Sequence, residues 1–242
     1  MDSARLIFRF DLRRDQDTGL KVDSFRLSIR QMNAIFLNPH QLDPFRPVKS
    51  LGPIMVMPYI DSTLAQQAAE LAALRSGSDG LLLAIHDVQR NGFIATINLA
   101  FRATDSPWFG YMAQDAFAGR SWMALALEAI QTEKAGLLGF NDGKWQGKLA
   151  SFGLAQRQWA TSNYSGDFFC PSYKSHYADT ELTLIALEQG RYAYEPNSLL
   201  VEVDWNKDYA KVNYDDRKIY IERASKGFDG KVIDPKLRNM FI

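Results

Sequence analysis

"IMVMPYIDSTLAQQAAELAALRSGSDGLLLAIHDV", residues 54–88, decides the fold. The apolar run at 54–60 predicts a buried strand. Residues 62–77 then carry apolar side chains at helical spacing and end in a glycine, as a helix does. A second apolar run, 80–88, predicts another buried strand, which ends in the acid Asp87. The stretch therefore predicts a strand–helix–strand unit.

The alternation of strand and helix continues after this unit. The patterns predict a helix at 91–104, a strand at 108–115, a helix at 121–134 and a strand at 135–142. Strands that alternate with helices indicate an α/β fold with a mostly parallel central sheet flanked by helices. Ligands bind outside the carboxyl ends of the strands in such sheets. Asp87 and Asp115 end two of the predicted strands, so both are candidates to face a ligand.

The first 50 residues have a different pattern. Two alternating segments surround the turn-like "DQDTG" within residues 5–30, which predicts an N-terminal β-hairpin. Residues 38–53, "NPHQLDPFRPVKSLGP", contain four prolines and are expected to be a connector. We therefore expect a hairpin and connector extension at 1–50, followed by one larger domain at 51–242 with a polar C-terminal tail.

Composition excludes some classes of protein. Lys+Arg and Asp+Glu both number 28, so the chain lacks the basic excess typical of a nucleic-acid binder. Its one cysteine, Cys170, precludes an internal disulfide and favours a reducing compartment. No stretch approaches the roughly 20 apolar residues of a membrane span. The expected location is the cytoplasm, either free or peripheral at the inner membrane, and a homo-oligomer is compatible with the pattern.

A polar cluster precedes an apolar helical pattern in "SHYADTELTLIALEQG", residues 175–190. Asp179 or Thr180 could cap the helix, and acids are favoured at its positive end. The alternative is that Asp179 and Glu181 form one wall of an active site. His176 and Asp179 could also bind a metal ion, although no second histidine lies close by in the sequence.

The other candidate motifs also allow two interpretations. Asp87 is either a turn former or an acceptor for the base or ribose of a nucleotide, and Asp115 is either an Asx-turn residue or a ligand for a hard divalent cation. The aromatics in "WATSNYSGDFFCPSY", residues 159–173, could stack on sugar rings or pack in the core. The sequence contains neither a P-loop nor a G-x-S-x-G elbow.

Taken in order, residues 54–220 resemble glycosyltransferases of the GT-A fold, most closely the family 2 type. "IMVMPYIDS" and "LLLAIHDV" stand where that family has its first strands, and Gly92 to Asn98 match its Gly-x5-Asn helix. "YMAQDAFAGRSW" occupies the place of the Asp-x-Asp metal motif and its following tryptophan, and "SGDFFCPSYKSHYADTELTLIALEQG" has the layout of the acceptor segment.

The resemblance implies roles for particular residues. The nucleotide contacts would be Asp61, Asp87, Gly92 and Asn98. Asp115 would bind the metal ion, and Asp179 would be the catalytic base, with Glu181 as a substitute or as an acceptor-orienting residue. The donor and acceptor sugars would face Trp122, Gly166 and His176.

Two departures from the family pattern concern the metal site. Ala113 replaces the first aspartate of the Asp-x-Asp motif. Where the family often has a histidine after the next strand, this sequence has Glu202 and Asp204, of which Glu202 is the expected substitute ligand.

The predicted function is an inverting transfer of a sugar, most readily from a UDP-sugar, to a glycan or lipid-linked glycan, assisted by Mn²⁺ or Mg²⁺, as in polysaccharide biosynthesis. One alternative is a GT-A-like domain that binds glycans or acts as a scaffold without catalysis. Another is a metal-dependent hydrolase that uses His176, Asp179 and Glu181.

Overall fold

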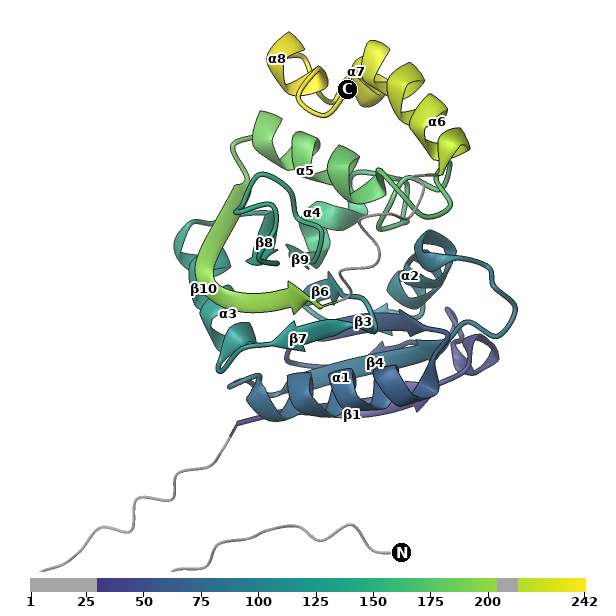
Figure 1. Ribbon diagram of the computed structural model, residues 1–242, viewed down its shortest axis with the longest axis vertical. Coiled ribbons are helices and arrows are strands. Elements are labelled where there is room, and N and C mark those ends of the chain that lie inside the picture. Colours follow the sequence, from purple (N-terminus) through teal and green to yellow (C-terminus); the bar gives the residue numbers. More distant parts are fainter. Residues whose placement is uncertain (1–29, 204–212) are drawn as a thin grey trace, which may run out of the picture.

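The computed structural model describes residues 30–203 and 213–242 of the chain. Ten strands occur in these ranges: β1 (Met32–Leu37), β2 (Val48–Lys49), β3 (Ile54–Tyr59), β4 (Gly80–His86), β5 (Thr104–Asp105), β6 (Trp108–Tyr111), β7 (Ala116–Ala118), β8 (Leu137–Asn141), β9 (Gly153–Gln156) and β10 (Tyr192–Glu202). Eight of them form the central sheet in the order β1-β4-β3-β6-β9-β8-β10-β7 (Figure 1). The short strands β2 and β5 pair separately.

The sheet is mostly parallel, as the sequence predicts. The pairs β1–β4, β4–β3, β3–β6 and β8–β10 are parallel. Strand β9 runs antiparallel between β6 and β8, and β7 runs antiparallel to β10 at the edge. These two reversed strands are short and were not among the predicted elements, because three or four residues carry little alternation signal.

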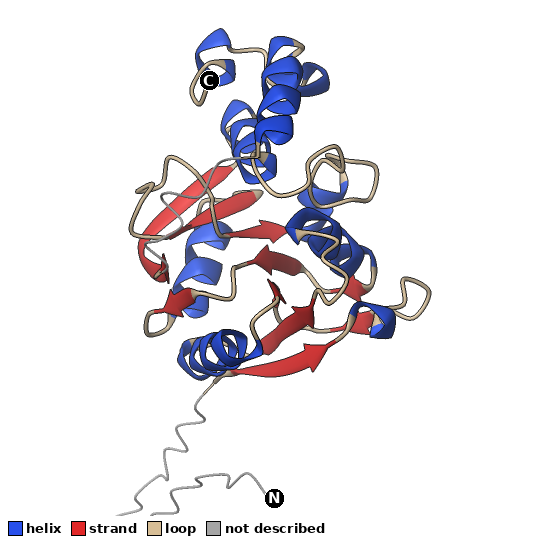
Figure 2. Ribbon diagram, turned by 45° about the vertical axis from the view of Figure 1, so that its right-hand side comes forward, coloured by secondary structure: helices blue, strands red, loops and turns tan. Residues whose placement is uncertain are grey.

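The described helices are α1 (Ser62–Arg75), α2 (Phe93–Arg102), α3 (Trp122–Thr132), α4 (Arg157–Thr161), α5 (Ala178–Glu188), α6 (Tyr214–Ser225), α7 (Gly227–Gly230) and α8 (Pro235–Arg238), with a single 3-10 turn at Pro39–Gln41. Buried residues of α1 and α3 join one apolar core, and those of α2 and α5 join a second. Helices thus cover both faces of the sheet. The C-terminal helices lie over α5 in both ribbon views (Figures 1 and 2).

The predicted strand–helix–strand unit is present as β3–α1–β4. All six residues of β3 are buried, which explains why the strand is apolar throughout instead of alternating. Helix α1 begins after Asp61, whose carboxylate accepts hydrogen bonds from the backbone N–H groups of Thr63 (2.9 Å) and Leu64 (3.0 Å). Asp61 therefore satisfies two of the N–H groups that a helix leaves unpaired at its start.

The central sheet begins inside the predicted N-terminal extension. Strand β1 pairs in parallel with β4, from Met32 opposite Gly80 to Leu37 opposite Ile85. Residues 32–37, which lie between the predicted hairpin and the predicted connector, are therefore an edge strand of the sheet. Most of the predicted hairpin at 5–30 lies outside the described residues. The proline-bearing segment that follows β1 contains only the 3-10 turn and the two-residue strand β2.

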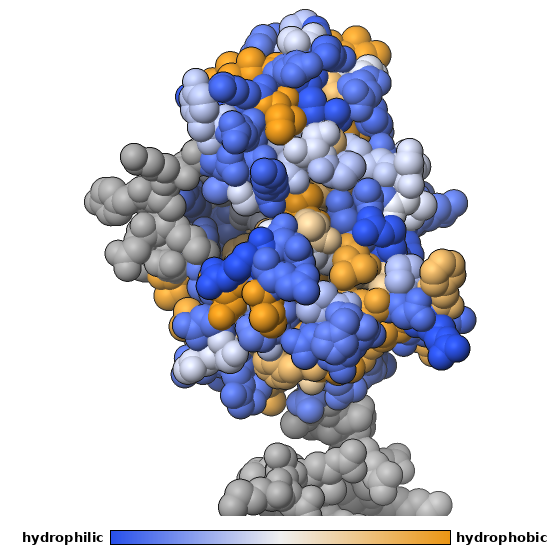
Figure 3. Space-filling model, turned by 90° about the vertical axis from the view of Figure 1, so that its right-hand side faces the viewer, coloured by the Kyte–Doolittle hydropathy of each residue, from blue (hydrophilic) through white to orange (hydrophobic). Residues whose placement is uncertain are grey.

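The surface of the molecule is largely hydrophilic on the face drawn in Figure 3, with hydrophobic side chains exposed in patches between the polar ones. Within residues 30–203 and 213–242, no helix combines the length and hydropathy needed to cross a bilayer.

Candidate active site

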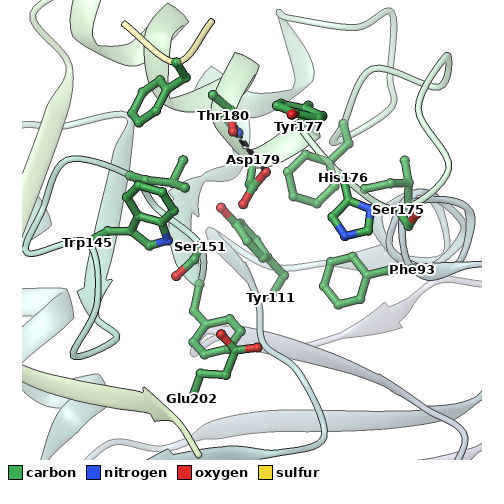
Figure 4. A pocket seen from close by; sticks show the side chains of 15 residues that line it. Phe93, Tyr111, Trp145, Ser151, Ser175, His176, Tyr177, Asp179, Thr180 and Glu202 are labelled. Carbon is green, nitrogen blue, oxygen red and sulfur yellow. Dashed lines mark hydrogen bonds between the residues drawn. The ribbon is translucent and has the colours of Figure 1, made fainter. Parts of the chain in front are cut away.

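A cavity of about 440 Å³ opens beside the first turn of α5. Aromatic side chains supply much of its wall, namely Phe93, Tyr111, Trp145, Tyr177 and Phe241. They come from α2, β6, the β8–β9 loop, the residue before α5 and the C-terminal segment, so the fold assembles the cavity from distant parts of the sequence. Figure 4 shows Asp179 pointing into it toward the Tyr111 ring, with Trp145 on one side and Phe93 and His176 on the other.

Asp179 is the acid at the centre of this cavity. Its Oδ1 atom accepts a hydrogen bond from the backbone N–H of Thr180 at 2.8 Å. Burial raises the pKa of the Asp179 carboxyl from 3.8 to about 6, and the nearby hydrogen bonds from Thr180 only partly oppose this effect. At neutral pH the group is therefore ionised, yet it binds a proton more tightly than an ordinary aspartate does.

Tyr111 lies against Asp179 and belongs to the wall of the same cavity. Its hydroxyl donates a hydrogen bond of 2.5 Å to the carbonyl oxygen of Ala150. Burial raises the pKa of Tyr111 well above 10, and the Asp179 carboxylate raises it further. The phenol therefore stays neutral, and its proton is directed away from Asp179, which leaves the carboxylate as the proton acceptor of the pair.

Helix α5 begins at Ala178, one residue before Asp179, and no side chain caps its first turn from the N-cap position. The residue at its N-cap position, Tyr177, has left-handed backbone angles (φ 68°) and makes no capping hydrogen bond with its side chain. Asp179 and Thr180 lie inside the first turn. The capping interpretation of the polar cluster is therefore wrong for both residues, and Asp179 is held where the helix dipole favours a negative charge.

Glu181 is fully buried and does not line the cavity. Its Oε1 atom accepts hydrogen bonds from the Tyr164 hydroxyl (3.0 Å) and Arg223 Nη2 (2.7 Å), and its Oε2 atom from the Tyr173 hydroxyl (2.8 Å) and Arg223 Nε (2.7 Å). Because both oxygens are engaged away from the cavity, Glu181 fastens α5 to α6. The structure contradicts its predicted catalytic role.

His176 lines the cavity (Figure 4), and its contact with a sugar stays a prediction. The backbone around it is fixed by Asp216 of α6, which accepts hydrogen bonds from the N–H groups of Lys174, Ser175 and His176, each at 2.9 Å. Burial alone would raise the pKa of Asp216, but these hydrogen bonds hold it below its usual range. Asp216 was not predicted, since nothing in its local sequence points to residues 174–176.

Asp87 and Gly92 shape the loop that leads into α2. Asp87 is buried, and its two oxygens accept hydrogen bonds from the N–H groups of Asn91 (2.9 Å) and Gly92 (2.8 Å). Gly92 has φ 99°, and a Cβ atom there would lie 2.9 Å from the carbonyl oxygen of Lys174. The turn-forming interpretation of Asp87 is thus realised, and Gly92 allows the loop to approach the segment that carries His176.

Asn98 connects α2 to the segment before α5. The side chain is buried; its Nδ2 donates to the carbonyl oxygen of Phe169 (3.0 Å), and its Oδ1 accepts from the N–H groups of Phe168 (3.2 Å) and Phe169 (2.9 Å). The side-chain amide of Asn98 thus holds the backbone of residues 168–169 against α2. Neither Asn98 nor Asp87 lines the cavity. Direct nucleotide contacts by either residue stay a prediction.

Asp61 and Gln114 tie together the loops that follow β3 and β6. The Oε1 atom of Gln114 accepts hydrogen bonds from the N–H groups of Ile60 (2.8 Å) and Asp61 (3.0 Å). Asp61 itself is exposed and caps α1. Gln114 occupies the middle position of the degenerate metal motif, and its contribution to the loop geometry was not visible in the sequence.

The two predicted metal ligands come together at one edge of the sheet. Strand β10 pairs with β7 so that Glu202 is opposite Ala116, and the N–H of Val203 donates to the carbonyl oxygen of Asp115 at 3.2 Å. Glu202 also lines the cavity, at the opposite end from Asp179 (Figure 4).

The described residues contain no cluster of three or more His, Cys, Asp or Glu side chains that could hold a metal ion by themselves. Two carboxylates nevertheless fit Mg²⁺ or Mn²⁺ when diphosphate oxygens and water complete the shell, because such ions keep several non-protein ligands. The hydrolase alternative loses support because its third member, Glu181, lies outside the cavity and is paired with Arg223.

Two predicted sugar contacts lie elsewhere in the molecule. Trp122 is fully buried; its Nε1 donates to the carbonyl oxygen of Ala72 at 2.8 Å, and its ring packs against Phe140. That prediction is wrong, because the indole belongs to the core between α1 and α3. Gly166 does not line the cavity either. The five aromatics of residues 159–173 are buried, namely Trp159, Tyr164, Phe168, Phe169 and Tyr173. Of these five, Phe169 alone lines the cavity, so the segment does not form the predicted sugar platform.

The β8–β9 loop contributes residues that the sequence analysis missed. Asp142 is buried, and its Oδ1 atom accepts hydrogen bonds from the N–H groups of Lys144 (2.9 Å) and Trp145 (2.8 Å). Its Oδ2 atom accepts a hydrogen bond from the Ser151 hydroxyl, which also lines the cavity. The sequence "NDGKWQG" signals a turn here, and a tryptophan within a turn beside an acid was the available clue.

No protein-family model and no curated protein matches this sequence. Solved structures do match in fold. The mannosyltransferase PcManGT from Pyrobaculum calidifontis, in complex with GDP-Man and Mn²⁺, aligns with 15% identity and a TM-score of 0.51 over 80% of this chain and 68% of its own. S. aureus TarS 1-349 aligns with 10% identity and a TM-score of 0.51, over 77% of this chain and 68% of its own.

A longer S. aureus TarS structure aligns with 10% identity and a TM-score of 0.55, over 77% of this chain and 41% of its own. At these identities the likeness concerns the fold. The mostly parallel sheet with helices on both faces is consistent with these matches. The chain therefore has the GT-A fold of glycosyltransferases, as the sequence predicts.

Proposed function

We propose that the protein is a glycosyltransferase that moves a sugar from a nucleotide-sugar donor to a hydroxyl group of an acceptor, with Asp179 as the general base. One observation carries the proposal: a GT-A fold presents a carboxylate with a pKa of about 6 inside a cavity walled by aromatic rings. A general base works best when its pKa lies near the working pH, and burial moves Asp179 in that direction.

The proposed reaction is a single displacement. The acceptor oxygen attacks the anomeric carbon while its proton passes to Asp179, and the bond between that carbon and the diphosphate oxygen breaks. The nucleoside diphosphate leaves with the bonding electron pair. Because attack and departure occur on opposite sides of the carbon, the anomeric configuration inverts. A positioned base of this kind contributes typically 10²–10⁴-fold to the rate.

Asp115 and Glu202 are the residues that would hold a divalent ion. When bound there, Mn²⁺ or Mg²⁺ supplies positive charge that stabilises the departing diphosphate. Glu202 lies at the opposite end of the cavity from Asp179, as the leaving group and the base must in an in-line displacement (Figure 4). We propose a UDP-sugar as the donor, on the resemblance of the sequence; PcManGT was solved with GDP-Man and Mn²⁺.

The setting that we propose is polysaccharide biosynthesis, with a glycan or lipid-linked glycan as acceptor. A thermal-shift series with UDP, GDP and CMP, each with and without Mn²⁺, tests the donor class. A nucleotide at a hundred times its dissociation constant stabilises the fold by about 2.7 kcal/mol. The melting temperature should then rise by roughly 2–4 °C for each kcal/mol. A rise for one nucleotide that requires Mn²⁺ supports the proposal, and no rise with any nucleotide contradicts it.

A second candidate is a GT-A-like domain that binds glycans or serves as a scaffold without transferring sugar. The observation that favours it is Ala113, which leaves the metal motif one carboxylate short. This candidate predicts saccharide binding with no consumption of any nucleotide-sugar. The transferase proposal predicts that donor is consumed and that consumption stops when Mn²⁺ is chelated.

A further inference from the structure

Trp145 and Phe241 form one wall of the Asp179 cavity from opposite regions of the sequence. Their rings meet edge to face, with centroids 6.0 Å apart and an interplanar angle of 78°. Both rings line the cavity and neither is fully buried. Because the two rings are nearly perpendicular, they form an apolar corner of the wall, against which the apolar face of a pyranose ring can pack.

The loop that presents Trp145 is rigidly built. Asp142 holds the backbone N–H groups of Lys144 and Trp145 with one oxygen and the Ser151 hydroxyl with the other. Gly147 has φ 81°, and a Cβ atom there would lie 2.5 Å from the Tyr194 ring, so the loop packs closely on β10. Such preorganisation fits a binding role for Trp145, because little conformational freedom remains to be lost when a ligand binds.

Charge on the cavity wall selects the kind of ligand. Asp179 and Glu202 are acidic, and the described lining residues include no Lys or Arg; His176 is the one basic side chain among them. A phosphate or carboxylate on the acceptor would therefore meet negative charge near Asp179, and the described lining residues supply no Lys or Arg to compensate it. Unpaired like charges in a partly desolvated site discriminate strongly against a ligand.

We infer that Trp145 and Phe241 form the acceptor subsite and that the acceptor is an uncharged pyranoside, with sugar phosphates and uronic acids excluded. The inference rests on the proposed function, since it names the acceptor class of the same site. It assigns the binding of the acceptor's sugar ring to two side chains that have no part in the proton transfer by Asp179.

The test is saccharide binding, which needs neither donor nor turnover. Saturation-transfer NMR would compare methyl glucoside, glucuronic acid and glucose 6-phosphate on the full chain, and then the corresponding galactose and mannose series. These probes share a ring and differ in charge. We expect signals from at least one neutral pyranoside and none from its charged counterparts. Binding of a charged sugar equal to that of its neutral parent, or no binding of any neutral sugar, would overturn the inference.

Variants then locate the subsite. Trp145→Ala and Phe241→Ala are expected to weaken the neutral sugar by roughly tenfold each, whereas Trp145→Phe keeps an aromatic face and loses less. Phe45→Ala is the matched control, because Phe45 is 95% exposed and lies outside the cavity. Unchanged affinity in both alanine variants would contradict the assignment. If the wild type binds neutral sugar yet never consumes donor, the transferase proposal fails and the subsite stands.

Discussion

Arg223 of α6 holds both carboxylate oxygens of Glu181 on α5, with Nε–Oε2 and Nη2–Oε1 distances of 2.7 Å. Glu181 lies two positions after Asp179, so this bidentate ion pair fixes the first turn of α5, which carries the proposed base. Arg223 also contacts Asp229 at 2.9 Å, which extends the link to α7. Helices α6 and α7 thus support the wall of the Asp179 cavity.

Removal of the Arg223 guanidinium should be costly for stability. Arg223→Met leaves the buried Glu181 carboxylate without its charged partner, and breaking a buried pair in this way costs about 3–5 kcal/mol. Urea unfolding followed by circular dichroism measures it. Lys226→Met is the matched control, because its ion pair with Glu222 at the end of the same helix is exposed to solvent and should contribute little to stability. Equal losses of stability in the two variants would contradict the prediction that the buried Arg223–Glu181 pair contributes more than the exposed pair.

The pH dependence of turnover should report Asp179. Its folded-state pKa is about 6, so the active, ionised form is lost as pH falls through that value. We expect kcat/KM to fall about tenfold for each pH unit below 6, since one proton is taken up. A rate that stays flat down to pH 4.5 in a protein that remains folded would exclude Asp179 as the base.

The same pKa makes a prediction for stability. A carboxyl whose pKa is raised on folding binds its proton more tightly in the folded state, so stability falls as pH rises from about 4 to about 6 and is constant above. The rise in the pKa of Asp179 from 3.8 to about 6 corresponds to a loss of at most about 3 kcal/mol in the free energy of unfolding at pH 7. Asp179→Asn should therefore be more stable than wild type at pH 7, with the difference vanishing near pH 4. Unfolding free energies at the two pH values measure this, and a less stable variant at pH 7 would contradict it.

Metal dependence should follow Glu202 and Asp115. Glu202→Gln and Asp115→Asn each remove one negative oxygen ligand, and the Mn²⁺ concentration for half-maximal activity should rise about tenfold or more. Titration of activity with Mn²⁺ after chelation measures it. Glu128→Gln serves as the control, because Glu128 is exposed on α3 and does not line the cavity. If the two ligand variants behave as the control does, the ion is held elsewhere.

Gly92 offers a test of the loop that faces His176. Gly92→Ala places a Cβ atom 2.9 Å from the carbonyl oxygen of Lys174, in addition to the cost of φ 99°. Gly190→Ala shares a positive φ of 62° but meets no neighbouring atom within 4 Å. We expect the first variant to lose about 1–3 kcal/mol more than the second. Equal melting temperatures of the two variants would show that the loops separate without cost.

The sequence predicted those parts of the fold that local patterns encode. The β3–α1–β4 unit and the α2, α3 and α5 segments were recognised because apolar runs and 3.6-residue spacing lie within single elements. Strands β7 and β9 were missed because they are too short to carry a pattern. Strand β1 was missed because the prolines after it suggested a connector, whereas the parallel pairing with β4 is a long-range contact.

The site was predicted in part for a similar reason. Asp179 and His176 were singled out because they share one short polar segment, and both line the cavity, while their roles stay predictions. Asp179 and Glu181 look alike in sequence, and only the position of Arg223, 42 residues later than Glu181, separates a proposed base from a buried anchor. Trp122 was predicted to face a sugar but is buried in the core, whereas Trp145, for which no role was predicted, lines the cavity. The local sequence does not distinguish a tryptophan of the core from one on a cavity wall.

The central claim is that Asp179 is the base of a nucleotide-sugar transferase, and its most direct test is donor consumption by wild type and Asp179→Asn. Both proteins would be incubated with Mn²⁺ and UDP-, GDP- and CMP-sugars plus neutral pyranoside acceptors, and product formation followed by mass spectrometry, with Asp215→Asn as an exposed aspartate control. The account predicts one donor consumed by wild type and control, a loss of about 10²–10⁴-fold in Asp179→Asn, and unchanged nucleotide affinity in all three. Full transfer by Asp179→Asn, or no consumption of any donor by wild type, would contradict it.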